Sequence, residues 1–266
     1  HQHLNPRITA QTWAGSLRHR WAASQPNHGM QLMTDDGQRV GALLAVYSDQ
    51  WIDGKLERFC NPHSWCVLES HRRHGIGLIL QLVRQKGWHF TMFTPNPKVT
   101  EVFRGLKFKD LDNRQWVTLN RPSPAALLPG RFAESGLDLI AQRLQGTALA
   151  EFEAHRRIPW LNFVAFGHGD DVALAIYKPT HWKRTRCAWL MHVSDRGTFE
   201  RQGHLLRSHL LLSHGFVTSR IESRWVDARP LLSVAAVRTQ PKLYQSSSLG
   251  DRDIRDVYSE LMSLDV

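Results

Sequence analysis

The sequence is short of cysteine, with 3 among 266 residues. An odd number this small cannot cross-link a chain of this length, which excludes a disulfide scaffold and favours a reducing compartment. No stretch of about 18 uncharged apolar residues occurs, which excludes a membrane-spanning helix. Residues 1–7 lack the apolar run and the cleavage site of a signal peptide. We therefore expect a cytoplasmic protein.

Acidic residues are outnumbered, with 24 Asp and Glu against 34 Lys and Arg, a net charge of +10. This balance predicts an anionic partner, such as a nucleic acid, a membrane surface or a phosphorylated small molecule. The basic residues are spread thinly, whereas nucleic-acid binders concentrate them on one helix or arm. A polynucleotide partner is therefore disfavoured. The 10 Trp, 4 Tyr and 11 Phe, within a hydrophobic fraction of 42%, exclude a disordered chain.

Hydrophobic periodicity predicts alternating helices and strands over the first 120 residues. Asp35-Asp36-Gly37 is typical of a tight turn between the two strands of a hairpin, and Gly87 is placed to end a helix. The expected helices are 8–23, 74–86 and 97–106, and the expected strands are 31–34, 39–47, 64–68, 88–93 and 107–110.

The chain changes character after residue 120, where Arg-Pro-Ser-Pro and then Pro129-Gly130 indicate a connector. We therefore expect an N-terminal domain at 1–120, a connector at 121–150 and a C-terminal domain at 151–266. Within the last of these, the expected strands are 162–166, 172–177, 187–193, 216–225 and 231–238, and the expected helices are 199–214 and 251–264.

The two halves resemble each other when 72–88 is laid over 200–216. This alignment places Gly75 on Gly203 and Gly87 on Gly215, and an aromatic residue and a strand follow in both copies. Each half then reads as hairpin, strand, helix and strand. The pattern favours an internal duplication, although helices that end in glycine before a strand are common enough to coincide.

The segment Arg72-Arg73-His74-Gly75-Ile76-Gly77 directly follows a predicted strand and opens a helix. Backbone N–H groups at a helix start have no partner within the helix, and the helix dipole adds positive charge there. Glycine lets a phosphate approach the backbone, and the arginines add charge. The segment therefore predicts an anion cradle. In the aligned second copy Arg72 becomes Glu200 and Gly77 becomes Leu205, so that copy has lost it.

Arg72-x-x-Gly75-x-Gly77 resembles the pyrophosphate loop of the GCN5-related N-acetyltransferases, which use acetyl-CoA or another acyl-CoA. The order of elements around it and the segment 95–108 are similar to that family as well. The resemblance covers about 8–119, and the second half resembles a degenerate copy. It implies an α/β (α+β) fold of two tandem acetyltransferase-like domains, each a mixed, mostly antiparallel sheet flanked by helices.

The resemblance also implies roles for individual residues. The segment from Arg72 to Gly77 would hold the CoA pyrophosphate through backbone amides, the strand end at 66–68 would pair with the pantetheine arm, and Asn96 would add a contact. Backbone N–H groups near Val67 and Leu68 would stabilise the oxyanion. The complete set is Cys66, Val67, Leu68, Arg72, Arg73, His74, Gly75, Ile76, Gly77 and Asn96.

Two positions depart from the family pattern. Phe103 stands where the family often has a tyrosine that protonates the leaving thiolate, and Lys107 replaces a glycine. Phenylalanine has no hydroxyl to donate, so a tyrosine acid at this position is excluded.

An acceptor that attacks a thioester must lose a proton, so a base with a pKa near neutrality is needed close to the acyl group. Glu69, at the end of the strand that would hold pantetheine, is the first candidate, although it could instead be an exposed carboxylate paired with Arg72 or Arg73. His63 and His71 are nearby alternatives.

In the second half, His192 and Asp195 end the equivalent strand and are further candidates for catalysis. A His–Asp pair can tune a base, although Asp195 could equally cap a turn. The spacing Cys60-x-x-His63-x-x-Cys66 contains metal-ligand types, but the segment reads as a buried strand without a second ligand pair, so we expect no metal.

These observations predict an acyltransferase that moves an acyl group, acetyl in the first instance, from CoA to an amine or hydroxyl by direct attack. The acceptor would be a small molecule, namely an amino sugar, a glycan precursor or the amine of an amino acid or peptide. The alternatives are a non-catalytic acyl-CoA-binding module and a nucleic-acid-directed protein. We expect a monomer or a homodimer.

Overall fold

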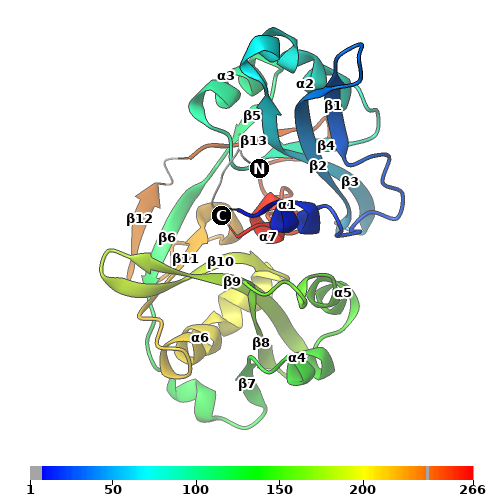
Figure 1. The fold of residues 1–266 in the computed structure, drawn as a ribbon. Coiled ribbons are helices and arrows are strands. Elements are labelled where there is room, and N and C mark those ends of the chain that lie inside the picture. The colour runs from blue at the N-terminus through cyan, green and yellow to red at the C-terminus, as the bar shows by residue number, and fades with distance from the viewer. Residues whose placement is uncertain (1–7, 238–239, 266) are drawn as a thin grey trace. The chain divides into compact units, whose positions relative to one another are not determined.

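The computed structural model describes residues 8–237 and 240–265, and these divide into two compact units. Unit 1 comprises His1–Leu111 and Gln240–Val266, and unit 2 comprises Asp112–Thr239. Each unit contains one mixed sheet with helices packed on it (Figure 1). Among the described residues, no helix combines the length and apolar character that crossing a bilayer requires.

The sheet of unit 1 has six strands in the order β1-β2-β3-β4-β13-β5. Their bounds are β1 Gly29–Met33, β2 Arg39–Ile52, β3 Lys55–Val67, β4 His89–Met92, β13 Lys242–Gln245 and β5 Lys109–Leu111. The hairpin expected around Asp35–Gly37 is confirmed, since Gly29–Met33 pairs antiparallel with β2. A second hairpin turns at Asp53-Gly54, where both residues have positive φ, and it makes β3 much longer than the expected strand at 64–68.

Strands β3 and β4 are parallel and pair at two positions, Phe59 with His89 and Cys60 with Phe90. Beyond Cys60 no further pair between them occurs in the described part of the chain, so the two strands separate toward their C-terminal ends. Asn61 lies just past the last pair, and its Nδ2 donates to the carbonyl oxygen of Thr91 at 3.1 Å. The sheet therefore opens between two neighbouring strands.

Helices α2 (Gly75–Val83) and α3 (Pro97–Gly105) pack on one hydrophobic core of unit 1. Leu78, Ile79 and Leu82 of α2 and Phe103 of α3 are buried in it. Helix α2 ends three residues before the expected Lys86, and Gly87 beyond it has a φ of +80°. These two helices confirm the expected positions of 74–86 and 97–106 to within a few residues.

The first and last expected helices of unit 1 are much shorter than predicted. Helix α1 spans Ala10–Ser16 within the expected 8–23, and Trp21 instead joins β2, where its carbonyl accepts from the N–H of Asp49 at 2.9 Å. Of the expected 251–264, α7 takes only Glu260–Ser263. Tyr258 has a φ of +63°, a left-handed conformation that a right-handed helix cannot include.

Unit 2 has a seven-stranded sheet in the order β12-β6-β11-β10-β9-β8-β7. The strands are β6 Arg114–Leu119, β7 Arg131–Glu134, β8 Asn162–His168, β9 Asp171–Trp182, β10 Thr185–Val193, β11 Thr218–Glu222 and β12 Ser233–Val237, and the helices are α4 Leu137–Arg143, α5 Gly146–His155 and α6 Arg196–Leu212. The last expected strand, 231–238, reaches one residue outside the described ranges.

The two units repeat the same topology. In unit 1 a hairpin leads to β3, helix α2 and the parallel strand β4, and in unit 2 a hairpin leads to β10, helix α6 and the parallel strand β11. All other strand pairs in both sheets are antiparallel. The expected fold, two mixed and mostly antiparallel sheets flanked by helices, is confirmed.

The units divide the chain at other points than the sequence indicates. Strand β6 lies within the expected N-terminal domain, yet it pairs with β11 and β12 of unit 2. Strand β13 lies within the expected C-terminal domain, yet it pairs with β4 and β5 of unit 1. The observed boundary therefore falls after Leu111 rather than at 120, and 240–265 return to unit 1.

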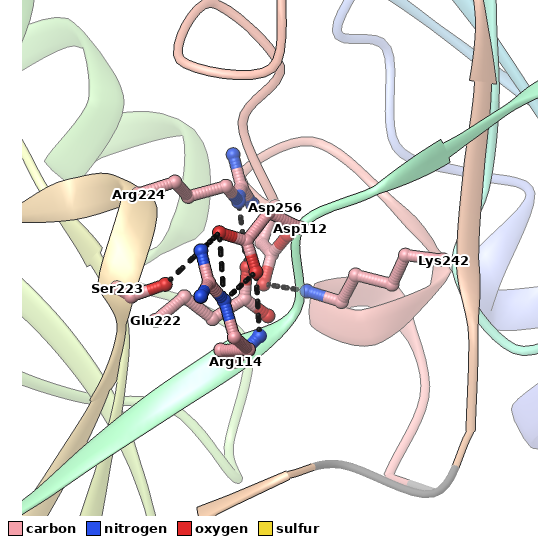
Figure 2. Close-up of polar contacts among 7 residues, drawn as sticks. All are labelled: Asp112, Arg114, Glu222, Ser223, Arg224, Lys242 and Asp256. Atoms are coloured by element: carbon pink, nitrogen blue, oxygen red, sulfur yellow. Dashed lines mark hydrogen bonds and ion pairs between the residues drawn. The ribbon is translucent and has the colours of Figure 1, made fainter. Parts of the chain in front are cut away.

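A buried ion pair joins two parts of the segment that returns to unit 1. The Nζ of Lys242 on β13 lies 2.5 Å from Oδ2 of Asp256, and the two side chains are 0% and 1% exposed (Figure 2). Figure 2 also shows Arg114 and Ser223 of unit 2 on Asp112, and Arg224 of unit 2 beside Glu222. The charges of Lys242 and Asp256 are so deeply buried that each requires an oppositely charged partner.

We predict that Asp256→Ala lowers the free energy of unfolding by about 3–5 kcal/mol, because it leaves the Lys242 charge buried without this carboxylate. Urea denaturation followed by tryptophan fluorescence measures the change. A matched substitution at the exposed Asp110, Asp110→Ala, should cost less than about 1 kcal/mol. Equal costs for the two variants would contradict the prediction.

Candidate functional site

A groove of about 710 Å³ opens in unit 1 at the separated ends of β3 and β4. The C-terminal end of β3, the segment 69–75 and the first two turns of α3 with its N-cap line it. The lining residues are Trp65, Cys66, Val67, Leu68, Glu69, Arg72, Gly75, Asn96, Lys98, Val99 and Val102. The structure thus brings together seven of the residues that the sequence analysis assigned to one site, although they come from separate segments.

The end of β3 presents one edge of its main chain to this groove. The N–H of Leu68 donates to the carbonyl of Val40 at 2.8 Å, on the β2 side. Because successive residues of a strand point their backbone groups to opposite sides, the N–H of Val67 points away from β2, toward the edge where β4 has separated. Val67 can therefore pair with an extended ligand, whereas the N–H of Leu68 is already engaged.

Residues 69–74 form a 3₁₀ helix that runs directly into α2 at Gly75. This conformation uses an amide of the expected cradle, since the N–H of Gly75 donates to the carbonyl of Arg72. Gly75 is buried, and a Cβ there would lie 3.2 Å from Cγ2 of Val67, so glycine lets the helix approach the strand. A Cβ on Gly77 would meet nothing within 4 Å, so the space over this residue is open.

The charged residues of this turn lie at the surface. Arg72 and Glu69 form an ion pair with Nη2 and Oε2 2.5 Å apart, and their side chains are 65% and 77% exposed. Arg73 donates from Nε to Nε2 of His74 at 3.0 Å, and Ile76 is exposed. Glu69 thus pairs with Arg72. From the sequence, this pairing is the alternative to a role as catalytic base.

Asn96 lines the groove but has a local role as well. It is the N-cap of α3, and its Oδ1 accepts from the N–H of Val99 at 3.0 Å. Phe103, at the position where the family often has tyrosine, is fully buried and packs edge-on against Phe108 with ring centroids 4.7 Å apart. Its ring belongs to the core rather than to the groove.

A second groove of about 650 Å³ lies along β1 and β2. Its lining includes Leu17, His28, Met30 and Arg39, together with Cys66 and Leu68. The last two residues line the first groove as well. The end of β3 is therefore accessible to ligands from two grooves of unit 1.

Glu260 is a buried carboxylate in unit 1 that the sequence analysis did not single out. Its Oε1 accepts from the N–H of Phe93 and from Oγ1 of Thr94, both at 3.1 Å, and its own N–H donates to Oδ1 of Asn61 at 2.8 Å. It thereby joins the separated ends of β3 and β4. Oε2 has no hydrogen-bond partner among the residues that the structure describes.

Burial raises the pKa of Glu260 to about 7. No sequence signal marks this residue, because Asn61 and Glu260 are 199 positions apart. His63, two residues after Asn61 on β3, is also buried, and burial lowers its pKa to about 4. The imidazole of His63 is therefore neutral at pH 7, and its Nδ1 lies 2.7 Å from Oγ of Ser64.

His192 and Asp195 of unit 2 have separate partners rather than each other. Nε2 of His192 lies 2.7 Å from Oε2 of Glu151 on α5, and both side chains are buried. Asp195 is the N-cap of α6, and its Oδ1 accepts from the N–H of Thr198 at 2.6 Å. Asp195 therefore caps a turn, which is one of the two arrangements that the sequence allows for it. Within the described ranges, no group of three His, Cys, Asp or Glu residues could hold a metal ion.

No protein-family model and no curated protein matches this sequence. Among solved structures, the chain is similar to a GCN5-related N-acetyltransferase from Anabaena variabilis, with a TM-score of 0.52 and 13% identity over 80% of this chain and 61% of that one. It is also similar to a protein from Enterococcus faecalis described as a probable N-acyltransferase, with a TM-score of 0.51 and 8% identity over 91% of this chain and 70% of that one.

The chain has the fold of the GCN5-related N-acetyltransferases. The expected resemblance is thereby confirmed at the level of the fold, and unit 1 contains the strand followed by a helix that opens at Gly75, which is part of the pattern on which the resemblance rests. The chain spans about three fifths of the length of the Anabaena variabilis protein.

The raised pKa of Glu260 predicts a pH-dependent stability. A carboxyl whose pKa is higher in the folded than in the unfolded state stabilises the fold most below its unfolded pKa of about 4.5, and this contribution is lost as the pH rises through about 7. Relative to Glu260→Gln, the wild-type chain should lose up to about 3 kcal/mol of stability between these limits.

Urea denaturation of both proteins at intervals of half a pH unit checks this expectation. The difference between the two proteins isolates Glu260, because every other titratable group, including the buried His63, Lys242 and Asp256, is present in both. A difference that stays constant from pH 4.5 to pH 7 would contradict the raised pKa.

Proposed function

We propose that the chain is an acyl-CoA-dependent acyltransferase that moves an acyl group, acetyl in the first instance, to an amine or hydroxyl of a small-molecule acceptor. The observation that carries the proposal is the 710 Å³ groove at the separated ends of β3 and β4. Val67, with its free strand edge, and Arg72 line this groove, and Gly77, with open space over it, lies two residues beyond Gly75 of the lining.

In this proposal each part of acyl-CoA meets a matching part of the groove. The amides of the pantetheine arm pair with the free main-chain edge at Val67, beside Cys66 and Leu68. The pyrophosphate lies over Gly77, where no side chain blocks it, and Arg72 and Arg73 supply positive charge. Asn96 on α3 contacts the arm from the other wall of the groove. His74, Gly75 and Ile76 form the turn that brings the phosphates to the start of α2.

The acceptor is proposed to enter by the second groove and to attack the thioester directly. Cys66 and Leu68 line both grooves, so the two reactants would meet at the end of β3. Holding the reactants together in this way removes the entropic cost of a bimolecular encounter. The N–H of Val67, which points away from β2, would donate to the oxyanion of the tetrahedral intermediate, which collapses as the carbon–sulfur bond breaks and CoA leaves as its thiolate. Acceptors of the amino-sugar, glycan-precursor or amino-acid type would fit a groove of this size.

Two carboxylates of unit 1 are candidates for the general base in this proposal. Glu260 has a pKa of about 7, which suits proton transfer near neutrality, and Oε1 binds the main chain directly after β4. Glu69 lines the groove itself but is ion-paired with Arg72. We favour Glu260. His192 and Asp195 remain proposals for a contribution of unit 2 to the reaction.

A non-catalytic acyl-CoA-binding module is the second candidate function. The observation that favours it is Phe103, a buried side chain without a hydroxyl at the place of the family's usual acid. Release of free thiol from acetyl-CoA in the presence of amino sugars and amino acids separates the two candidates, since a binding module releases none.

The groove predicts binding of acetyl-CoA that depends on the space over Gly77. Gly77→Asp should weaken binding at least about tenfold, because the new carboxylate would repel the pyrophosphate. Gly105→Asp is the matched control, since a Cβ there also meets nothing within 4 Å and lies outside the groove. Isothermal titration calorimetry measures both. An affinity for acetyl-CoA that is unchanged in Gly77→Asp, or no binding of any acyl-CoA to the wild-type chain, would contradict the proposal.

The choice of base predicts that Glu260→Gln lowers kcat by about 10²-fold or more, with KM for acetyl-CoA little changed. The wild-type rate should rise as the pH increases through about 7, and this rise in the pH–rate profile should be absent from the variant. Thiol release over pH 5.5–9 measures both effects. If Glu69→Gln lowers kcat by a comparable factor and the rate of Glu260→Gln still rises with pH through about 7, the general base is Glu69 instead.

A further inference from the structure

A small pocket of unit 2 is lined by cationic side chains. Its volume is about 320 Å³, and it lies between the segment 121–124 and helix α6. The lining residues are Arg121, Pro122, Ser123, Pro124, His204 and Arg207. None of these described lining residues is acidic, although the pocket contains two guanidinium groups and an imidazole.

Helix α6 places His204 and Arg207 on one face. They are three positions apart, which puts them side by side, while Leu205, Leu206 and Leu210 are buried in the core. Gly203 lies in the helix interior, where glycine costs up to about 1 kcal/mol relative to alanine. A Cβ at Gly203 would lie 3.2 Å from Nη1 of Arg207 and 3.3 Å from Phe199. The glycine thus leaves room for the guanidinium to lie back along the helix.

The charges around the pocket repel one another. Burial, and then the charge of Arg121, lower the pKa of Arg207. Burial, and then Arg131 and Arg207, lower the pKa of His204, whose Nε2 lies 3.5 Å from Nη1 of Arg131. Like charges gathered in a partly desolvated place destabilise the fold unless an anion joins them.

Other arginines of unit 2 are paired with carboxylates. Arg201 binds Asp171 at 2.7 Å, and Arg143 binds Glu134 at 3.1 Å. The contrast shows that acidic partners are available to this unit and are placed elsewhere. Arginine is also the side chain best shaped to bind phosphate oxygens with two parallel hydrogen bonds.

The wall opposite α6 is fixed in place. The N–H of Ser123 donates to Oγ of Ser208 at 3.1 Å, and Nδ2 of Asn120 donates to the carbonyl of Phe216 at 2.9 Å. Pro122 and Pro124 restrict the backbone on both sides of Ser123. Arg121 is therefore presented on a rigid segment, which lowers the entropic cost of binding a ligand.

We propose that this pocket binds a phosphate-bearing small molecule, with Arg121, Arg207 and His204 around the phosphate and Arg131 adding positive charge from beside His204. A volume of about 320 Å³ admits a phosphate group with a small organic body. The site is built from unit 2 alone and is independent of the groove proposed for acyl-CoA in unit 1. In this proposal, unit 2 binds a ligand that is distinct from the acyl-CoA proposed for unit 1.

Calorimetry of the full chain with inorganic phosphate and with pyrophosphate tests the proposal, with sodium chloride added to keep the ionic strength constant. We expect saturable binding that weakens at least about tenfold in Arg121→Gln and in Arg207→Gln. Arg184→Gln, at an exposed position in the turn between β9 and β10, is the matched control and should bind as the wild type does. Gly77→Asp should also retain this binding, which separates it from any phosphate affinity of unit 1.

A second measurement guards against variants that merely unfold. Without ligand, Arg121→Gln should leave the melting temperature unchanged or raise it, because it removes a repelling charge. With pyrophosphate, the wild type should gain stability and the variant should not. Absence of saturable binding, binding retained in both arginine variants, or an equal loss in Arg184→Gln would overturn the proposal.

Discussion

The separation of β3 from β4 is the constraint on which the candidate site of unit 1 depends. A sheet strand that loses its neighbour exposes main-chain groups that must find other partners. The structure satisfies part of this requirement internally, since Asn61 reaches across to Thr91 and Glu260 binds the main chain after β4. The edge at Val67 is left for a ligand. The opening that would admit acyl-CoA and the placement of Glu260 between the separated strand ends are thus consequences of one feature of the sheet.

Each sheet is completed by a strand from a distant part of the chain. Unit 1 takes β13 from the C-terminal segment, and unit 2 takes β6 from the segment that follows β5. The units consequently cannot be separated by cutting the chain at one linker. The buried Lys242–Asp256 pair lies on the returning segment, and the same segment delivers Glu260 to unit 1. Completion of the sheet and placement of this carboxylate therefore depend on the same stretch of chain.

Sequence reasoning succeeded where local chemistry decides the structure. The hairpin at Asp35–Gly37 and the helices before Gly87 and after Asn96 follow from turn and capping preferences within a few residues. It failed where distant pairing decides, because an alternating pattern indicates a strand without naming its neighbour. The sequence therefore indicates β6 as part of the N-terminal half, whereas the strand pairs with β11 and β12 of unit 2. The sequence likewise predicts one long helix that includes Glu260, since nothing local shows that the backbone turns left-handed at Tyr258.

The aligned glycines of the two copies show how the halves have diverged. Gly75 starts α2, and a 3₁₀ turn precedes it, whereas α6 begins at Arg196 and carries Gly203 in its interior. The segment that forms the proposed phosphate turn in unit 1 is thus regular helix in unit 2. A regular helix has no exposed amides there for a pyrophosphate, but it does have a continuous outer face. His204 and Arg207 lie on that face, and Gly203 makes room for the guanidinium. The absence of a phosphate turn from unit 2 and the position of its proposed phosphate pocket therefore have the same structural origin.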